Sequence, residues 1–328
     1  MTPETYAGSG VDIDAGEEAV RRIGPAVRAT FTESVLTDVG GFGAPFALDT
    51  SRFSRPVLVS STDGVGTKLL VAEATGRYDT IGIDLVAMVV DDLVCQGAEP
   101  LFLLDYLAVG ALDPDVVEAV VGGIAEGCRQ ARCALIGGEM AEHPGSMEPD
   151  RIDVAGFAVG VVERDRLITG DQARPGDLLI GLPSPGLRSN GYALARRVLL
   201  EVAGLPLDGV ADDLLLPSVI YAPAVVDLLA EVVVRGVAHI TGGGIPGNLP
   251  RALPDDVGYW LDPSTWDVPP IFGLIQQHGE VSDEEMAKVF NLGIGMVVVV
   301  APADADHTIA SLAASGHAAR AIGEVTPG

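Results

Sequence analysis

A short apolar run that ends in glycines is the feature of this sequence that most constrains its fold. Residues 56–60 are Pro-Val-Leu-Val-Ser, and residues 63–68 are Asp-Gly-Val-Gly-Thr-Lys. The apolar run predicts a buried strand, and the glycines let backbone N–H groups approach a ligand where the strand ends. Asp63 is suited to hold Mg²⁺, and Lys68 is suited to meet a phosphate. Taken alone, the stretch also fits a hairpin turn with a surface lysine.

Three further glycine-rich stretches share this pattern. Two of them follow short β-prone runs, and the third lies in a loop-rich N-terminal segment. Backbone N–H groups in such loops can surround a phosphate, although each loop is also compatible with a simple connector. The stretches are Gly40-Gly41-Phe42-Gly43, Gly137-Gly138-Glu139 and Thr241-Gly242-Gly243-Gly244. His239 lies just before the last stretch, as either a core residue or a site residue.

Acidic side chains interrupt a segment that should be a buried helix. Residues 80–97 are apolar almost all round a helix, which predicts burial. Asp84, Asp91 and Asp92 lie within this segment. Buried carboxylates are costly unless they are paired or bind a metal, so a functional face is favoured. For Asp84, a structural role as a hydrogen-bond acceptor stays open.

Near the N-terminus, Asp12 and Asp14 stand at alternate positions before another helical pattern. They either belong to the site or form an acidic helix start, where the helix dipole favours negative charge.

Charge and cysteine usage exclude several classes of partner. The chain has 46 acidic against 20 basic residues, a net charge of −26, which disfavours nucleic acid and anionic membranes. Its 3 cysteines lack metal-ligand spacing, so we expect reduced thiols. The start of the chain lacks the pattern of a secretory signal, and no apolar run is long enough to span a membrane. We therefore expect a cytoplasmic protein.

The alternation of strands and helices predicts an α/β fold with two domains. The polar stretch 164–176 ends in the turn signal Pro175-Gly176, and we place the domains at 1–165 and 166–328. In the second, Ser189-Asn190-Gly191 opens a helix whose free N–H groups suit an anion. The dinucleotide fingerprint, the P-loop, the nucleophile elbow and the zinc-protease helix motif are all missing from the sequence.

These motifs, taken in order, resemble the phosphoribosylformylglycinamidine cyclo-ligase family, the aminoimidazole ribonucleotide synthetases. They extend over essentially the whole chain, so the resemblance is specific. The matching stretches are Gly10–Gly16, Gly40–Ala44, Thr62–Lys68, Asp79–Met88, Asp92–Val94, Gln96–Phe102, Gly123–Cys128, Gly137–Glu139, Asp153–Phe157, Ser189–Tyr192, His239–Gly244, Phe290-Asn291 and Gly293–Met296.

The resemblance implies a two-domain α/β (α+β) fold and an ATP-dependent ligase. The N-terminal domains would pair in a homodimer and close a mixed barrel, with ATP near that interface. The C-terminal α/β domain would complete the cleft. The implied reaction closes formylglycinamidine ribonucleotide to aminoimidazole ribonucleotide through a phosphorylated amide, and it releases ADP and phosphate. Such transfer depends on positioning and charge neutralisation.

The resemblance also assigns roles to residues. The metal ligands would be Asp63, Asp92 and Glu139, with Asp12 or Asp14 as a possible supplement. The catalytic set would be Asp63, Lys68 and His239, the histidine polarising the amide or transferring a proton. The ATP site would comprise Gly40, Gly41, Gly43, Gly64, Gly66, Thr67, Lys68, Asp92, Gly137, Gly138 and Glu139. The substrate would meet Ser189, Asn190, Gly191, Thr241, Gly242 and Gly243.

Four positions depart from the family pattern, and they leave alternatives open. Ala7 lies where a lysine contact is usual, Met140 replaces a threonine, Asp91 an asparagine and Arg188 a histidine. None belongs to the proposed acid set, and Arg188 is suited to contact an anionic group. The alternatives are a paralogous ATP-dependent enzyme, such as a thiamine-monophosphate kinase-like enzyme, and a non-catalytic nucleotide-binding dimer.

Overall fold

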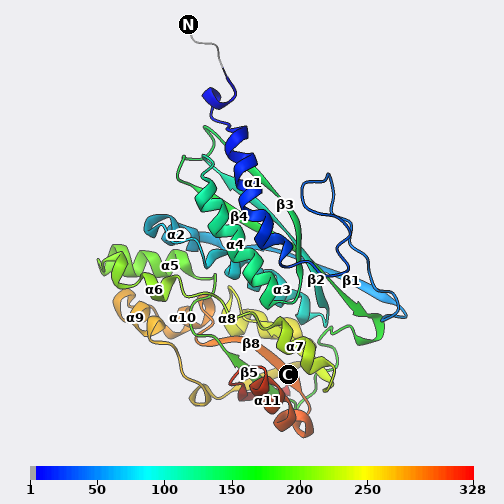
Figure 1. Cartoon of the computed structure of the whole chain (residues 1–328). Helices are drawn as coiled ribbons and strands as arrows, with labels where there is room; N and C mark the ends of the chain where they lie inside the picture. Colours follow the sequence, from blue (N-terminus) through cyan, green and yellow to red (C-terminus); the bar gives the residue numbers. More distant parts are fainter. Residues whose placement is uncertain (1–4) are drawn as a thin grey trace.

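Two β-sheets organise the chain, one in each half. The computed structural model describes residues 5–328 and contains a four-stranded sheet of order β1-β4-β2-β3 and a five-stranded sheet of order β6-β8-β5-β9-β7 (Figure 1). The first sheet is complete by residue 163, and the second begins at residue 178. This separation agrees with the expected α/β organisation, while the boundary at 165/166 stays a prediction.

The N-terminal half packs helices against one face of its mixed sheet. Strands β1 and β2 each run antiparallel to β4, and β3 runs parallel to β2 at the edge. Helices α1 and α4 lie side by side across this sheet, as Figure 1 shows. The elements are α1 Ile13–Arg28, β1 Pro56–Gly64, α2 Leu69–Thr75, α3 Ile81–Cys95, β2 Glu99–Val109, α4 Pro114–Gln130, β3 Ala134–Glu142 and β4 Ile152–Glu163.

The C-terminal half is built on an antiparallel sheet. Strand β8 lies between β6 and β5, and all seven of its residues, Ile294–Val300, are buried. The elements are β5 Leu178–Pro183, α5 Tyr192–Arg196, α6 Ala211–Leu214, α7 Ala222–Leu229, β6 Val234–His239, α8 Gly244–Asn248, β7 Val257–Leu261, α9 Pro270–Gly279, α10 Asp283–Val289, β8 Ile294–Val300, α11 Ala305–Ala314 and β9 Arg320–Pro327.

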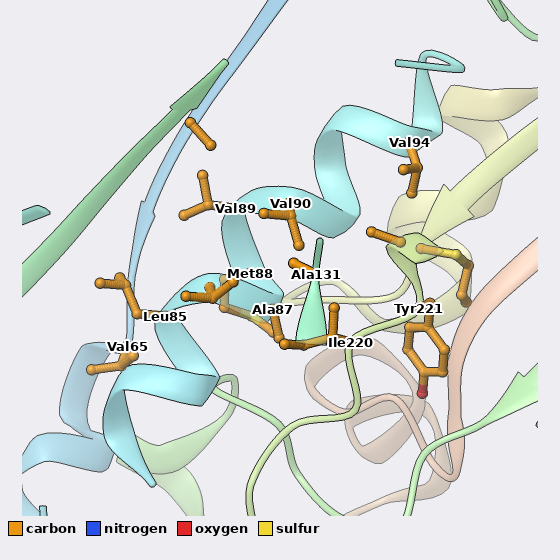
Figure 2. Close-up of a cluster of buried hydrophobic side chains, with 14 of the residues drawn as sticks. Val65, Leu85, Ala87, Met88, Val89, Val90, Val94, Ala131, Ile220 and Tyr221 are labelled. Carbon is orange, nitrogen blue, oxygen red and sulfur yellow. The ribbon is translucent and has the colours of Figure 1, made fainter. Parts of the chain in front are cut away.

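Helix α3 is the buried centre of the molecule, as its all-round apolar sequence predicts. Its side chains contact both halves, and Figure 2 shows Leu85 and Val90 of α3 in one cluster with Tyr221 of the C-terminal half. Helices α3 and α4 touch backbone to backbone, because a Cβ atom at Gly82 would lie 2.0 Å from the Ile124 nitrogen. This close approach requires glycine at the crossing.

Two glycine-rich stretches extend strands, although the sequence predicted that they end them. Strand β1 continues through Asp63 to Gly64, and β3 continues through Gly137-Gly138-Glu139 to Glu142. Pairing with β4 and β2 compensates for the low strand propensity of glycine at these positions.

One face of the N-terminal sheet carries exposed apolar side chains. Leu58 is 62% exposed, and Tyr106 and Phe157 are each 42% exposed. The ladder places all three on the face opposite Gly156, against which Leu85 and Val89 of α3 pack. We call this surface the open sheet face.

Within residues 5–328, no helix is long and apolar enough to cross a membrane.

Candidate active site

Three of the predicted loops meet where the two halves join. Gly66 follows β1 and lies near the loop before α5, because a Cβ atom at Gly66 would be 3.9 Å from the Ser189 carbonyl oxygen. On the other side, the Asn190 amide would lie 3.6 Å from a Cβ atom at Gly242. The loops after β1, before α5 and after β6 therefore line one junction, as the proposed site requires.

Two aspartates and a histidine lie beside this junction. The Asp92 carboxylate accepts hydrogen bonds from His239 Nδ1 at 2.9 Å and from Ser61 Oγ at 3.2 Å. Burial opposes charge on Asp92, but these hydrogen bonds lower the pKa of the carboxyl below its ordinary value. Burial and the neighbouring Asp92 carboxylate raise the pKa of Asp63. Asp63 and Asp92 thus form an electrostatically coupled pair.

Within one chain, Glu139 does not lie beside this pair, so a single protomer does not bring the three predicted metal ligands together. The register aligns Asp63 with Gly156, Asp105 and Gly138, so Glu139 lies three strand spacings away, roughly 14 Å, and points to the opposite face. Within residues 5–328, no three His, Cys, Asp or Glu side chains come together to hold a metal ion. The sequence could not show this, because strand order and side-chain face follow from long-range pairing.

Lys68 is a buried structural residue in this structure, in contrast to its predicted contact with phosphate. Its side chain is 0% exposed, and Nζ lies 2.6 Å from Asp84 Oδ2. The ammonium also donates to the Leu216 carbonyl at 2.8 Å, and the other Asp84 oxygen accepts from Ser218. Burial lowers the pKa of Lys68, and the Asp84 carboxylate opposes that shift. The structural alternative for Asp84 is therefore the one that the contacts support.

Arg188 is also buried, and the anionic group that it contacts is a carboxylate of the protein itself. The residue is 2% exposed, and Nη2 lies 2.8 Å from Asp91 Oδ2 and 2.9 Å from His239 Nε2. Two positions that depart from the family pattern, Asp91 and Arg188, are thus in direct contact. They adjoin the acid pair through His239, a connection that sequence spacing does not indicate.

A hollow at the edge of the N-terminal sheet gathers much of the predicted ATP-binding set. It has a volume of about 780 Å³ and lies between α1, α4, β3 and the loop at residues 38–44. Its lining includes Gly40, Gly41, Gly43, Gly137, Gly138 and Glu139. We call it the sheet-edge cavity.

Asp105 is a functional candidate in this cavity that sequence reasoning did not single out. It lines the cavity among apolar side chains, and burial raises the pKa of its carboxyl to about 7. The signal was an acid inside an otherwise apolar β-prone run, since β2 reads Glu-Pro-Leu-Phe-Leu-Leu-Asp-Tyr-Leu-Ala-Val. Burial, and not a neighbouring charge, causes this shift, and the position of Asp105 in the cavity lining makes its carboxyl available to a ligand.

Two buried side-chain oxygens in the loop before α5 are further candidates for contacts with a ligand. Ser189 Oγ and Asn190 Oδ1 are buried and lack a hydrogen-bond partner among the described residues. Gly191 at the helix start has φ +77°, and a Cβ atom there would lie 2.2 Å from the Phe290 ring. Unpaired buried polar atoms are costly, which is consistent with a substrate that satisfies them.

At the N-terminus, Asp12 caps helix α1 and accepts a hydrogen bond from the Ala15 N–H at 3.1 Å. Asp14 lies in the first turn of the same helix. The acidic helix start is therefore the interpretation that these contacts support.

Comparison with known proteins places this site in a family. The model of the AIR synthase related protein N-terminal domain matches residues 50–162, and that of the C-terminal domain matches residues 174–328. The chain is thus one of the AIR synthase related proteins. A protein of Sorangium cellulosum is 54% identical over 98% of this chain and 95% of its own length. One of Trichlorobacter lovleyi is 51% identical over 98% of this chain and 94% of its own. Both are named phosphoribosylformylglycinamidine cyclo-ligase, and this chain belongs to that family.

Solved structures show that the fold is shared more widely. Thiamine-monophosphate kinase from Stenotrophomonas maltophilia has a TM-score of 0.69 at 19% identity, over 95% of this chain and 94% of its own. The hydrogenase maturation protein HypE in complex with ATP has a TM-score of 0.62 at 19% identity, over 94% of this chain and 84% of its own. At these identities the similarity concerns the fold alone.

Proposed function

We propose that this chain closes the imidazole ring of aminoimidazole ribonucleotide in purine biosynthesis. It uses ATP and formylglycinamidine ribonucleotide and releases ADP and phosphate, as a ligase that forms a C–N bond. The observation that carries this function is the identity of about half of all positions, over nearly the whole chain, with enzymes named for this reaction. The kinase alternative is not favoured, because its support is a shared fold at 19% identity.

The reaction requires a good leaving group on an amide carbon. Transfer of the ATP γ-phosphoryl group to the formyl amide oxygen supplies one, since phosphate departs far more readily than an amide oxygen. The amidine nitrogen then attacks that carbon, the C–N bond closes the ring, and the C–O bond to phosphate breaks. The protein contributes orientation and a water-poor site. Unpaired Ser189 Oγ and Asn190 Oδ1 are positioned to hold the substrate.

Asp63 and Asp92 are the residues that would hold Mg²⁺. Two coupled carboxylates suit this ion, which is commonly bound by one or two protein carboxylates together with substrate phosphates. Burial is the main cause of the raised pKa of Asp63, and the negative charge of Asp92, which a cation would offset, adds to it. When bound, the ion would offset charge on the phosphates. Glu139 of the same chain is left out of this pair because it lies three strands away from Asp63. Lys68 is left out of the proposed phosphate contacts because it is buried against Asp84.

We assign the sheet-edge cavity to the nucleotide. Its mostly apolar lining suits a purine base, and the backbone of Gly40–Gly43 suits phosphate oxygens. A protonated Asp105 carboxyl can donate to N1 of adenine and accept from its amino group. The cavity lies at the edge of the sheet, away from Asp63 of the same chain. We therefore further propose a homodimer, in which the phosphates of the nucleotide bound to one protomer lie in a cleft that the two protomers share.

A coupled assay tests the function directly. We expect ADP release that depends on formylglycinamidine ribonucleotide and yields an aminoimidazole product. ATP binding without turnover would instead support the non-catalytic dimer, and ADP release with thiamine monophosphate would support a kinase. The free state of the three cysteines is consistent with the reducing cytoplasm, where we expect the reaction.

Asp63→Asn tests the revised metal site. The substitution keeps the size of the side chain but removes one of two paired carboxylates, so kcat should fall about 100-fold or more while the fold persists. Steady-state kinetics at several Mg²⁺ concentrations, with circular dichroism as the folding check, measure this.

The matched control is Asp255→Asn, at an exposed aspartate of the C-terminal half, which should keep wild-type kinetics. Near-normal turnover of Asp63→Asn would refute the metal role.

A further inference from the structure

Arg188 is an unusual residue to bury, and its surroundings are specific. It has φ +63° in the loop before α5, where a residue other than glycine is strained. Its Nη1 donates to the Val219 carbonyl at 2.8 Å, and the guanidinium lies 4.9 Å from the centre of the Tyr221 ring. This residue combines a strained backbone with a buried permanent charge. Such a combination persists only where the surrounding contacts fix it, so they fix the position of this guanidinium.

Both carboxylate oxygens of Asp91 accept hydrogen bonds in this arrangement. One carboxylate oxygen accepts from the backbone N–H groups of Tyr221 and Ala222, at 2.8 and 2.9 Å, and thereby caps helix α7. The other oxygen accepts from Arg188. With both oxygens occupied inside the protein, Asp91 balances the charge of Arg188 and links α3 to the C-terminal half.

The contact between Arg188 and His239 determines where the imidazole carries its proton. A guanidinium has donors but no acceptor, so His239 Nε2 at 2.9 Å from Nη2 must accept. The proton then resides on Nδ1, which donates to Asp92 Oδ1 at 2.9 Å. Asp92 Oδ2 accepts from Ser61. The carboxylate is therefore oriented from both sides.

We propose that Arg188, paired with Asp91, is a positioning residue that holds the His239 proton on Nδ1 and thereby orients the Asp92 carboxylate at the site. The inference rests on the proposed function for the importance of Asp92, but the proton position itself does not. It also revises the predicted role of His239. With Nε2 facing a guanidinium and Nδ1 facing a carboxylate, His239 orients Asp92 and does not transfer a proton to substrate.

The proton position can be read directly by NMR. Full-length protein labelled with ¹⁵N at its 5 histidines should show one imidazole with a protonated Nδ1 and an accepting Nε2, absent from His239→Gln. In Arg188→Met, that signal should lose the Nδ1-only pattern. A wild-type His239 that carries its proton on Nε2, or an unchanged pattern in Arg188→Met, would overturn the proposal.

Kinetics separate positioning from mere stability. Arg188→Met should lower kcat per folded molecule about 10- to 100-fold while KM for the ribonucleotide changes little, since outer-shell partners of metal ligands typically have effects of this size. Arg188→Lys supplies only donors, so it should restore the proton pattern and much of kcat. A per-molecule kcat that stays at the wild-type value in Arg188→Met would contradict the proposal.

Two controls keep the test decisive if Arg188→Met folds poorly. The double variant Asp91→Asn with Arg188→Met removes both charges, so it should regain stability but not kcat or the proton pattern. Arg235→Met breaks another partly buried ion pair, to Asp177 at 2.5 Å, away from His239, and should keep wild-type kcat per folded molecule. If wild type forms no ADP with formylglycinamidine ribonucleotide, the proposed function fails, whereas the NMR result still decides the proton position.

Discussion

At the scale of single residues, Asp105 shows how an apolar environment changes a carboxyl group. Its cavity excludes much of the solvent that would stabilise the charge, and burial raises its pKa from 3.8 to about 7. The folded protein thus binds a proton that the unfolded chain has released between about pH 4 and pH 7. This group therefore makes the fold less stable as pH rises through that window.

Asp105→Asn should remove this pH dependence. Near pH 4 the variant and wild type should have similar stability, because the Asp105 carboxyl is protonated in the folded chain and still partly protonated in the unfolded chain, while near pH 8 the variant should be more stable, by at most about 4 kcal/mol at about 1.36 kcal/mol per pKa unit. Melting temperatures of nucleotide-free protein at both pH values measure the difference. An equal offset at both pH values would contradict the assigned pKa, and Asp255→Asn should show no pH-dependent offset.

At the scale of elements, the contact between α3 and α4 fixes the centre of the molecule. Gly82 and Gly123 let the two backbones touch, and no side chain fits between them. Gly82→Ala should lower the free energy of unfolding by about 1–3 kcal/mol, as overpacking does. Gly122→Ala is the matched control, because no atom lies within 4 Å of its Cβ position in α4, and it should stabilise by up to about 1 kcal/mol. Urea unfolding compares the two, and equal effects would show that the close approach is not tight.

The elements themselves follow well from the sequence, because their signals are local. Asp113 and Pro114 open α4 as a cap and first residue, and the all-round apolar pattern of α3 predicts its burial. The loops of the site were likewise predicted by glycines next to β-prone runs. What local patterns could not give is the partner of each charge. Arg188 and Asp91 lie 97 positions apart, and the face of Glu139 depends on register across four strands.

At the scale of the whole molecule, the open sheet face is a surface that the described part of the chain, residues 5–328, leaves uncovered. Leu58, Tyr106 and Phe157 expose apolar area on a sheet whose other face is packed against helices. Exposed apolar side chains on one face of a sheet are typical of an interface between subunits. A second copy of the chain offers the same surface, so two sheets can face each other and close the mixed barrel of the proposed homodimer.

Phe157→Glu should therefore convert a dimer into a monomer. In a symmetric dimer each subunit places one such charge in the apolar interface, and both charges lose their contact with water. The dissociation constant should therefore rise about 100-fold or more. Light scattering after size exclusion should give about twice the chain mass of 33.8 kDa for wild type and a single mass for the variant. Val202→Glu changes another exposed apolar residue, which is 62% exposed and lies in the C-terminal half, and this variant should stay dimeric. A wild type that is monomeric at micromolar concentration would remove the dimer. A monomeric variant with full turnover would instead show that each chain completes its own site.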